Sequence, residues 1–218
     1  NKMSNMKQTL DQNFPGAMSI PELVLIVSEK ISSQGYLPSK VKPAKATCRD
    51  DSIEQLGESL KAGGFLSPFR MEALAGHPVF GATSVGAWYH HIPDNGIGVI
   101  FYGPHIGIDS KGALGYLDRE GQGHIGKSCG AQHALLGHFK LSQFGPYAGD
   151  SELSAVADAL NGSQMRIIGA EVPILEMTNE LYQRGLDTLT QLVQERQRTD
   201  DKKFPVLIVG GVNVDTHY

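Results

Sequence analysis

The chain has few of the features that commit a protein to a membrane or to a disulfide scaffold. Only 2 of its 218 residues are cysteines, which is too few for the several bridges that stabilise small secreted domains. Its longest apolar runs, such as "ELVLIVSE" and "FPVLIVGG", fall well short of the roughly 20 residues of a membrane-spanning helix. We therefore expect no membrane span, and free thiols in a reducing compartment.

Positive charge is also scarce. The chain has 19 Lys and Arg against 23 Asp and Glu, a formal net charge of -4, and the basic residues are scattered. Because nucleic-acid binding needs a basic patch or stripe, nucleic acid is not an expected partner. The polar start "NKMSNMKQTLDQN" is not a signal peptide. Since it does not begin with Met, we read the chain as trimmed, with any targeting peptide in the missing part.

What is present indicates one α/β domain over residues 1–218, with N-terminal helices in 1–40 and a core in 41–218. The length suits a single core, and candidate strands alternate with candidate helices along the chain. This interleaving predicts a small, partly parallel central sheet flanked by helices. Apolar runs predict strands at 44–48, within 97–108 and within 204–211.

Capping and breaking residues predict where several helices begin. Ser19 can cap a helix that has Pro21 in its first turn and Glu22 at its positive end. A long helical pattern runs from about 164 to 198, with Pro173 expected to kink it or to start a new helix. The glycine-rich stretch from 112 to 128 predicts a hairpin.

The stretch "KATCRDDSIEQL" places Cys48, Arg49 and Asp50 between a predicted strand and a predicted helix. Such connections commonly carry the chemistry of α/β proteins. Asp51 can cap the helix that follows.

Two thiols and an imidazole are a ligand set that suits zinc and leaves a fourth position open. Either His105, at the end of the best predicted strand, or His133, on one helix face with Cys129, could join Cys48 and Cys129. The chain has no C-x-x-C or H-E-x-x-H motif. Two alternatives stay open at this point: both cysteines are small core residues, or Cys48 is a nucleophile activated by a helix N-terminus and Arg49.

Several stretches together resemble one family. "CRDD", "HPVFGATSVGAWYHHIPDNG", "VIFYGPHIGI", "GYLDREGQ" and "SCGA" are similar, in order and rough spacing over about residues 40–140, to the limiting CO2-inducible protein B family (LCIB-like proteins). That family is related in site architecture to β-class carbonic anhydrases. The resemblance implies a fold like theirs and a Zn²⁺ ion held by Cys48, His105 and Cys129, with His105 favoured over His133.

The implied activity is that of a zinc lyase, the reversible hydration of CO2 to bicarbonate by a zinc-bound hydroxide. Zinc with two thiolates and one neutral imidazole carries no net charge and polarises water weakly, so Asp50 would orient the water. Arg49 would keep Asp50 charged and away from the metal. Either His90 or His91 is a candidate proton shuttle. An apolar pocket for CO2 has five candidate wall residues: Val79, Phe80, Trp88, Phe101 and Tyr102. For Trp88 and Tyr89 the simpler interpretation is that they are core residues.

The resemblance also implies a homodimer, with the stretch "AWYHHIPDNG" as a candidate exposed apolar surface, and a possible hetero-assembly with a paralogue. It further leads us to expect the plastid (chloroplast stroma) for an algal source and the cytoplasm otherwise. Two other functions use the same ligands. One is a catalytically silent, zinc-binding scaffold subunit of a CO2-concentrating system. The other is a zinc hydrolase acting on a different small substrate.

Overall fold

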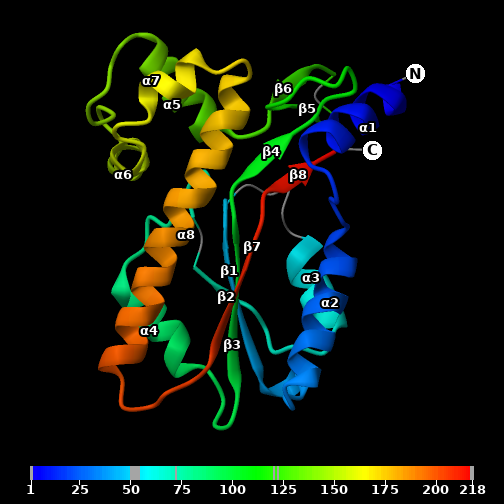
Figure 1. The fold of residues 1–218 in the computed structure, drawn as a ribbon, viewed down its shortest axis with the longest axis vertical. Coiled ribbons are helices and arrows are strands. Elements are labelled where there is room, and N and C mark those ends of the chain that lie inside the picture. Colours follow the sequence, from blue (N-terminus) through cyan, green and yellow to red (C-terminus); the bar gives the residue numbers. More distant parts are fainter. Residues whose placement is uncertain (1, 50–54, 72, 120, 122, 217–218) are drawn as a thin grey trace.

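A parallel sheet forms the centre of the molecule (Figure 1). The computed structural model describes residues 2–49, 55–71, 73–119, 121 and 123–216, and of residues 2–4 only the backbone. The strand order is β2-β1-β3-β7, and each neighbouring pair is parallel. These strands are β1 (Val41–Thr47), β2 (Phe69–Arg70), β3 (Ile97–Gly103) and β7 (Val206–Gly210). The expected α/β fold is confirmed.

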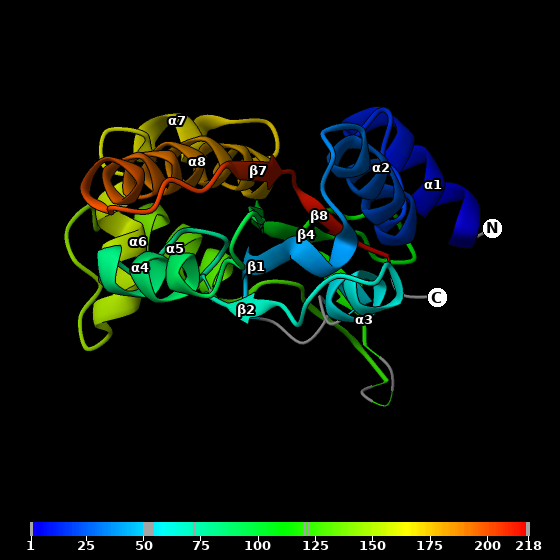
Figure 2. The same ribbon diagram turned by 90° about the horizontal axis from the view of Figure 1, so that it is seen from below.

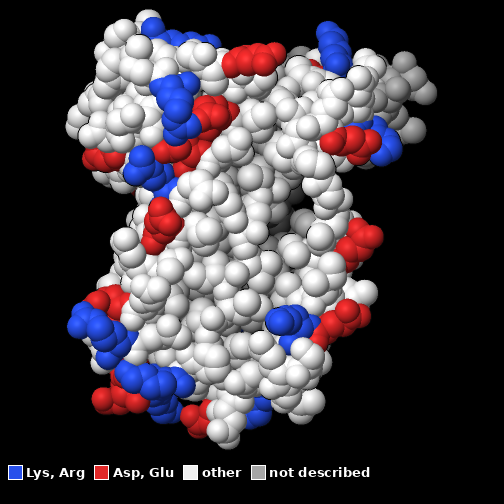
Figure 3. Space-filling view, in the orientation of Figure 1, with Lys and Arg blue, Asp and Glu red and all other residues white. Residues whose placement is uncertain are grey.

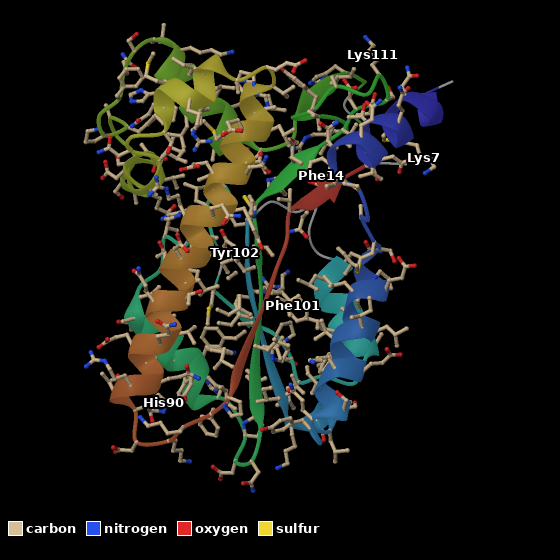
Figure 4. All side chains as sticks on the ribbon, in the orientation of Figure 1. Lys7, Phe14, His90, Phe101, Tyr102 and Lys111 are labelled. Carbon is tan, nitrogen blue, oxygen red and sulfur yellow. The ribbon has the colours of Figure 1, made fainter. Side chains whose placement is uncertain are left out.

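Helices cover both faces of this sheet (Figure 2). On one face lie α4 (Ala82–His90) and α8 (Pro173–Thr199), and on the other α2 (Ile20–Ser33) and α3 (Gln55–Ala62). Strand β3 is buried along its whole length, as expected for a strand covered on both sides. Tyr102 packs into the core under α4 and α8, whereas Phe101 packs into the core under α2 and α3, and Figure 4 shows the two side chains on opposite sides of the strand.

A second group of elements lies beyond the carboxyl ends of β1 and β3 (Figure 1). Two short strand pairs belong to it, one parallel (β4, β8) and one antiparallel (β5, β6). Its core is formed largely by helices α5 to α8. The remaining bounds are α1 (Lys2–Asn13), a 3-10 turn (Pro38–Lys40), β4 (His105–Gly107), β5 (Tyr116–Asp118), β6 (Ile125–Lys127), α5 (Gly130–Lys140), α6 (Ser151–Ala159), α7 (Gln164–Gly169) and β8 (Asn213–Asp215).

Two of the predicted helix starts, at Ser19 and Pro173, are confirmed. Ser19 accepts a hydrogen bond from the backbone N–H of Glu22, and the Glu22 carboxylate accepts one from the backbone N–H of Ser19, which completes a capping box. Pro173 starts α8 rather than kinking a longer helix. The hairpin predicted within 112–128 is present as β5 and β6.

The strand boundaries differ from the prediction in two places. The strand predicted at 44–48 begins earlier, at Val41, and ends at Thr47. The strand predicted within 97–108 is divided into β3 and β4 at Pro104, because proline has no backbone N–H to donate to a ladder. This division places His105 at the first position of a new strand.

The prediction that "AWYHHIPDNG" offers an exposed apolar surface is wrong for its aromatic residues. Trp88 and Tyr89 are 0% and 1% exposed. The absence of a side chain at Gly98 makes room for the indole, since a Cβ there would lie 2.6 Å from Trp88. The strand predicted within 204–211 as buried is β7, which is half-buried because it lies at an edge of the sheet.

None of the helices in the described part of the chain combines the length and apolar character needed to cross a bilayer.

Candidate metal centre

Three residues from separate parts of the chain meet at the carboxyl edge of the central sheet. Cys48 follows β1, His105 begins β4 directly beyond β3, and Cys129 immediately precedes α5. One ligand atom from each lies within 4.8 Å of the other two, and all three residues are buried. This edge is where open α/β folds place their ligands. The structure therefore brings together the three residues that the sequence resemblance marks as metal ligands.

Strand pairing explains why Cys48 reaches His105. Thr47 is paired with Gly103 in the ladder of β1 and β3, so the residues that follow, Cys48 and Pro104, leave the sheet side by side. On its other side Cys48 forms a parallel bridge with Ala73. Cys48 is thus fixed between two neighbouring segments of backbone.

A tight turn after Ala73 packs against Pro104. The backbones of Leu74 and His77 exchange two hydrogen bonds, of 3.1 and 2.8 Å. Between them, Gly76 has a φ of +80°, and a Cβ at this position would lie 2.2 Å from Cα of Pro104. Both the conformation and the close approach require glycine.

The donor set fits zinc. Two thiolates and an imidazole are borderline-soft ligands, and three protein ligands leave one position open. Tetrahedral zinc with bonds of about 2.0–2.3 Å separates its donor atoms by roughly 3.5–3.8 Å. Small side-chain movements from separations within 4.8 Å would reach that spacing.

The ring of His105 is oriented by a carboxylate from the last strand. Its Nδ1 lies 2.8 Å from Oδ2 of Asp215, with the two side chains 0% and 12% exposed. Since a carboxylate only accepts hydrogen bonds, Nδ1 donates, and Nε2 is the nitrogen that the neutral ring would offer to a metal. Burial alone lowers the pKa of His105, but the hydrogen bond with Asp215 and the contact with Cys48 outweigh it and raise the pKa to about 10.

A buried amide holds the backbone of His105. Nε2 of Gln132 donates to the His105 carbonyl at 2.9 Å, and its Oε1 accepts from the Thr178 hydroxyl at 2.8 Å. Gln132 and Thr178 are both 0% exposed. This network ties α5 and α8 to the start of β4, so His105 is held at its ring and at its main chain.

Arg49 lies at the surface, next to the buried cluster. Its two terminal nitrogens bind both carboxylate oxygens of Glu152 in the first turn of α6, at 3.1 and 2.9 Å. The two side chains are 41% and 47% exposed. Asp50, the predicted partner of Arg49, and Asp51, the predicted helix cap, lie outside the described residues.

The other candidate histidines do not join the cluster. His133 Nε2 donates to the Gly115 carbonyl at 2.7 Å, and burial lowers its pKa. His90 lies at the end of the molecule opposite to β4 (Figure 4), with Nε2 2.6 Å from a terminal nitrogen of Arg196. The ring of His91 packs against Phe69 at 5.8 Å. The structure brings neither candidate shuttle to the cluster.

A cavity of about 670 Å³ lies on the α2 and α3 side of the cluster, lined among others by Thr47, Phe101, Tyr102 and Asp215. Figure 3 shows the molecule hollowed in this region, amid uncharged residues. Two of the five predicted pocket-wall residues, Phe101 and Tyr102, therefore line a cavity. Among the described residues that line it there is none of the three candidate ligands, so its use as a CO2 pocket stays a prediction. Val79 instead packs on the core that contains Cys48 and Cys129.

Two of the predicted wall residues belong to the core under α4 and α8. Trp88 is fully buried and its indole N–H donates to the Lys42 carbonyl at 3.2 Å. Phe80 packs against the same core. The prediction that Trp88 lines a substrate pocket is wrong, because the indole fills the space above Gly98.

Sequence reasoning missed three residues of this site: Gln132, Glu152 and Asp215. Asp215 follows the apolar strand "FPVLIVGG" by only a few residues, and an acidic residue just beyond a buried strand is a usable signal. Gln132 and Glu152 carry no comparable signal, since each lies in an ordinary helical pattern.

Comparisons with known proteins agree with this architecture. A family model described as limiting CO2-inducible proteins B/C β carbonic anhydrases matches residues 17–218. The crystal structure of PtLCIB4, a homolog of the limiting CO2-inducible protein LCIB, is similar with a TM-score of 0.87 and 27% identity, over 96% of this chain and 88% of that one. The crystal structure of LCIB itself shares the fold, with a TM-score of 0.69 and 22% identity, over 94% and 86% of the two chains. A search of curated proteins gave no match.

The family model spans nearly the whole chain, and the cluster of Cys48, His105 and Cys129 lies where the resemblance placed it. The chain belongs to the family of limiting CO2-inducible proteins B/C β carbonic anhydrases.

Proposed function

We propose that this chain is a zinc lyase that catalyses the reversible hydration of CO2 to bicarbonate. The observation that carries the proposal is the buried cluster of Cys48, His105 and Cys129, with ligand atoms within 4.8 Å of one another, in a chain of a carbonic anhydrase family. Zinc bound there would act as a Lewis acid and lower the pKa of a bound water. The three residues would hold the metal and keep the fourth position open.

The residues around the cluster supply an environment suited to CO2. Ala75 and Ile106 are buried in the same core as the two cysteines, and Val79 packs against it. Carbon dioxide is small and nonpolar, so it binds against apolar walls and does not need a charged side chain. These walls would also exclude competing water from the site.

Arg49 and Asp50 would control the proton of the attacking water. Asp50 follows Arg49 directly in the chain, and a charged carboxylate there would accept the hydrogen bond of the water. The guanidinium of Arg49 would keep that carboxylate ionised and away from the metal.

We also propose that the chain works as a homodimer. Strand β7 is an edge strand of the sheet, and an exposed edge is a template for pairing with another chain. Leu25 and Ile26 of α2 are 59% and 50% exposed, which adds an apolar surface that a second copy could cover.

The second candidate function is a zinc-binding scaffold subunit that is catalytically silent. One observation favours it: Arg49 forms a two-point ion pair with Glu152. A guanidinium engaged by Glu152 has fewer donors for Asp50, and an unrestrained Asp50 could take the fourth metal position. All three metal ligands would then be present, but Asp50 would block the fourth position of the metal.

The test is a CO2 hydration assay on purified protein of known zinc content. Wild type should hold one zinc per chain and hydrate CO2, Cys48→Ala should lose both, and Asp50→Ala should keep the zinc and lose most of the rate. Stoichiometric zinc without a rate above buffer would support the scaffold, and ester hydrolysis without CO2 hydration would support a zinc hydrolase. A zinc-free wild-type protein would exclude all three.

A further inference from the structure

The last described strand brings a carboxylate to the back of the candidate metal centre. Strand β8 pairs in parallel with β4, with His105 opposite Asn213 and Gly107 opposite Asp215. The carbonyl of Asp215 accepts a hydrogen bond from the N–H of Ile108 at 2.9 Å. The main chain of Asp215 is therefore fixed by the same strand whose first residue is His105.

The contact between Asp215 and His105 is largely shielded from solvent. The 2.8 Å hydrogen bond joins side chains that are 12% and 0% exposed. A hydrogen bond to a charged acceptor is about twice as strong as a neutral one, and it is weakened little by solvent when it is buried. This carboxylate can therefore hold the orientation of the His105 ring.

The hydrogen bonds of Gln132 do not orient the ring of His105. Gln132 binds the main-chain carbonyl of His105, which fixes the backbone but does not itself set the torsion of the ring. A half-turn of an imidazole exchanges the places of its nitrogens and carbons. The 2.8 Å hydrogen bond from Nδ1 to Asp215 selects the orientation in which Nε2 faces the cysteines.

We propose that Asp215 is a positioning residue for the metal: it holds His105 so that Nε2 joins the two thiolates in binding Zn²⁺. The inference rests on the proposed function only in requiring that the cluster binds zinc, and it does not require that the chain hydrates CO2. Carboxylates that accept from a metal-binding histidine typically change metal affinity by 10–100-fold when they are removed.

The test makes two measurements on each variant of the full chain. One is the Zn²⁺ affinity, from competition with a chromogenic chelator, and the other is the absorption spectrum of the Co²⁺-substituted protein. Asp215→Ala should weaken Zn²⁺ binding by 10–100-fold and alter the Co²⁺ spectrum. Asp215→Asn should lose less, because its amide oxygen can still accept the hydrogen bond of Nδ1. Thermal unfolding of each metal-free variant reports whether the fold is retained.

Asp109 offers a matched control in the same part of the fold. It is 3% exposed and accepts hydrogen bonds from the N–H groups of Lys111 and Ala113, so its role is to hold a turn. Asp109→Asn should lower the stability of the metal-free protein and leave Zn²⁺ affinity unchanged.

The proposal is overturned if Asp215→Ala and Asp215→Asn bind Zn²⁺ as tightly as wild type, or if Asp109→Asn loses as much affinity as Asp215→Ala. A wild-type chain that binds no Zn²⁺ also overturns it. Zinc binding that depends on Asp215 in a chain without CO2 hydration would support the positioning role while excluding the enzyme.

Discussion

The two halves of the candidate site differ in how the fold holds them. Cys48, His105 and Cys129 are 7%, 0% and 3% exposed, and the cysteines pack within the hydrophobic core. Arg49 is adjacent in sequence to Cys48, yet its side chain is 41% exposed and its ion pair with Glu152 lies at the surface. Buried groups are fixed by packing and strand pairing, whereas exposed ion pairs are weak and screened by salt.

We therefore expect the buried half to govern metal affinity and stability, and the exposed half to govern the rate of catalysis. Changes near the buried ligands should alter metal affinity or stability by several kcal/mol, because they create cavities, clashes or unpaired polar groups. Changes at the exposed pair should leave the fold intact and act on the rate alone. The following predictions test the buried half first and the exposed pair last.

The largest effect is expected from removing a buried ligand. Cys129→Ala should reduce bound zinc from one per chain to a trace and abolish CO2 hydration, because two ligands do not retain zinc against dilution. Metal analysis after dialysis and a hydration assay measure both. His133→Ala is the matched control on the same helix, and it should keep its zinc; zinc loss in the control with retention in Cys129→Ala would assign the ligand role to His133.

The next largest effect is on stability. Gly76→Ala adds a methyl group 2.2 Å from Cα of Pro104 at a φ of +80°, so we expect overpacking and backbone strain together to cost roughly 2–5 kcal/mol of unfolding free energy. Denaturant unfolding of the metal-free protein measures it.

Gly162 separates the two contributions. Its φ is +82°, but a Cβ there would have no atom within 4 Å. Gly162→Ala should therefore lose only the conformational part, about 1 kcal/mol. Equal losses in the two variants would show that the turn does not pack closely on the start of β4.

The sequence predicts those parts of the architecture that depend on residues adjacent in the chain. Ser19 and Pro173 mark helix starts because capping and the missing proline N–H are local effects. The motif around Cys48 could be placed in a connection after a strand because an apolar run precedes it and helix-capping residues follow it.

The remaining features depend on neighbours distant in sequence. Asp215 lies 110 residues from His105, and only the pairing of β8 with β4 brings them together. The sequence leaves two interpretations of Trp88, a core residue or a pocket wall, and the structure supports the core residue. Its burial depends on Gly98, a glycine on a different element that leaves room for the indole.

A third prediction concerns the pH dependence of stability, which buried His77 should control. His77 is 7% exposed, its Nδ1 has no hydrogen-bond partner among the described residues, and burial lowers its pKa to about 4. The unfolded chain therefore takes up a proton first as pH falls, so the folded state loses up to about 3 kcal/mol between pH 6.5 and 4.

His77→Phe removes the titrating group and keeps a ring of similar size. Its unfolding free energy should fall less steeply than that of wild type over the same pH window, with no difference in slope above pH 7.5. Denaturant unfolding at a series of pH values measures both slopes, and parallel curves from pH 6.5 to 4 would mean that the folded state accommodates a charged imidazole.

The smallest effect is expected at the exposed pair. Glu152→Gln removes one charge of a pair whose members are 41% and 47% exposed, so unfolding free energy should change by less than about 1 kcal/mol. If Glu152 competes with Asp50 for Arg49, as argued above for the silent scaffold, releasing up to about 1 kcal/mol raises the share of Arg49 beside Asp50 by up to about fivefold. The rate of CO2 hydration should rise by a similar factor at low salt, where the competing pair is strongest.

Glu195 provides the control, because it pairs with Arg198 at 2.6 Å near the end of α8, with side chains 51% and 74% exposed. Glu195→Gln should match the small stability change and leave the rate unaltered. High salt should erase the gain in Glu152→Gln, because the wild-type pair is then already screened. A rate that falls in Glu152→Gln would reverse the interpretation: Glu152 would then hold Arg49 in its working position, and the exposed half of the site would be as organised as the buried half.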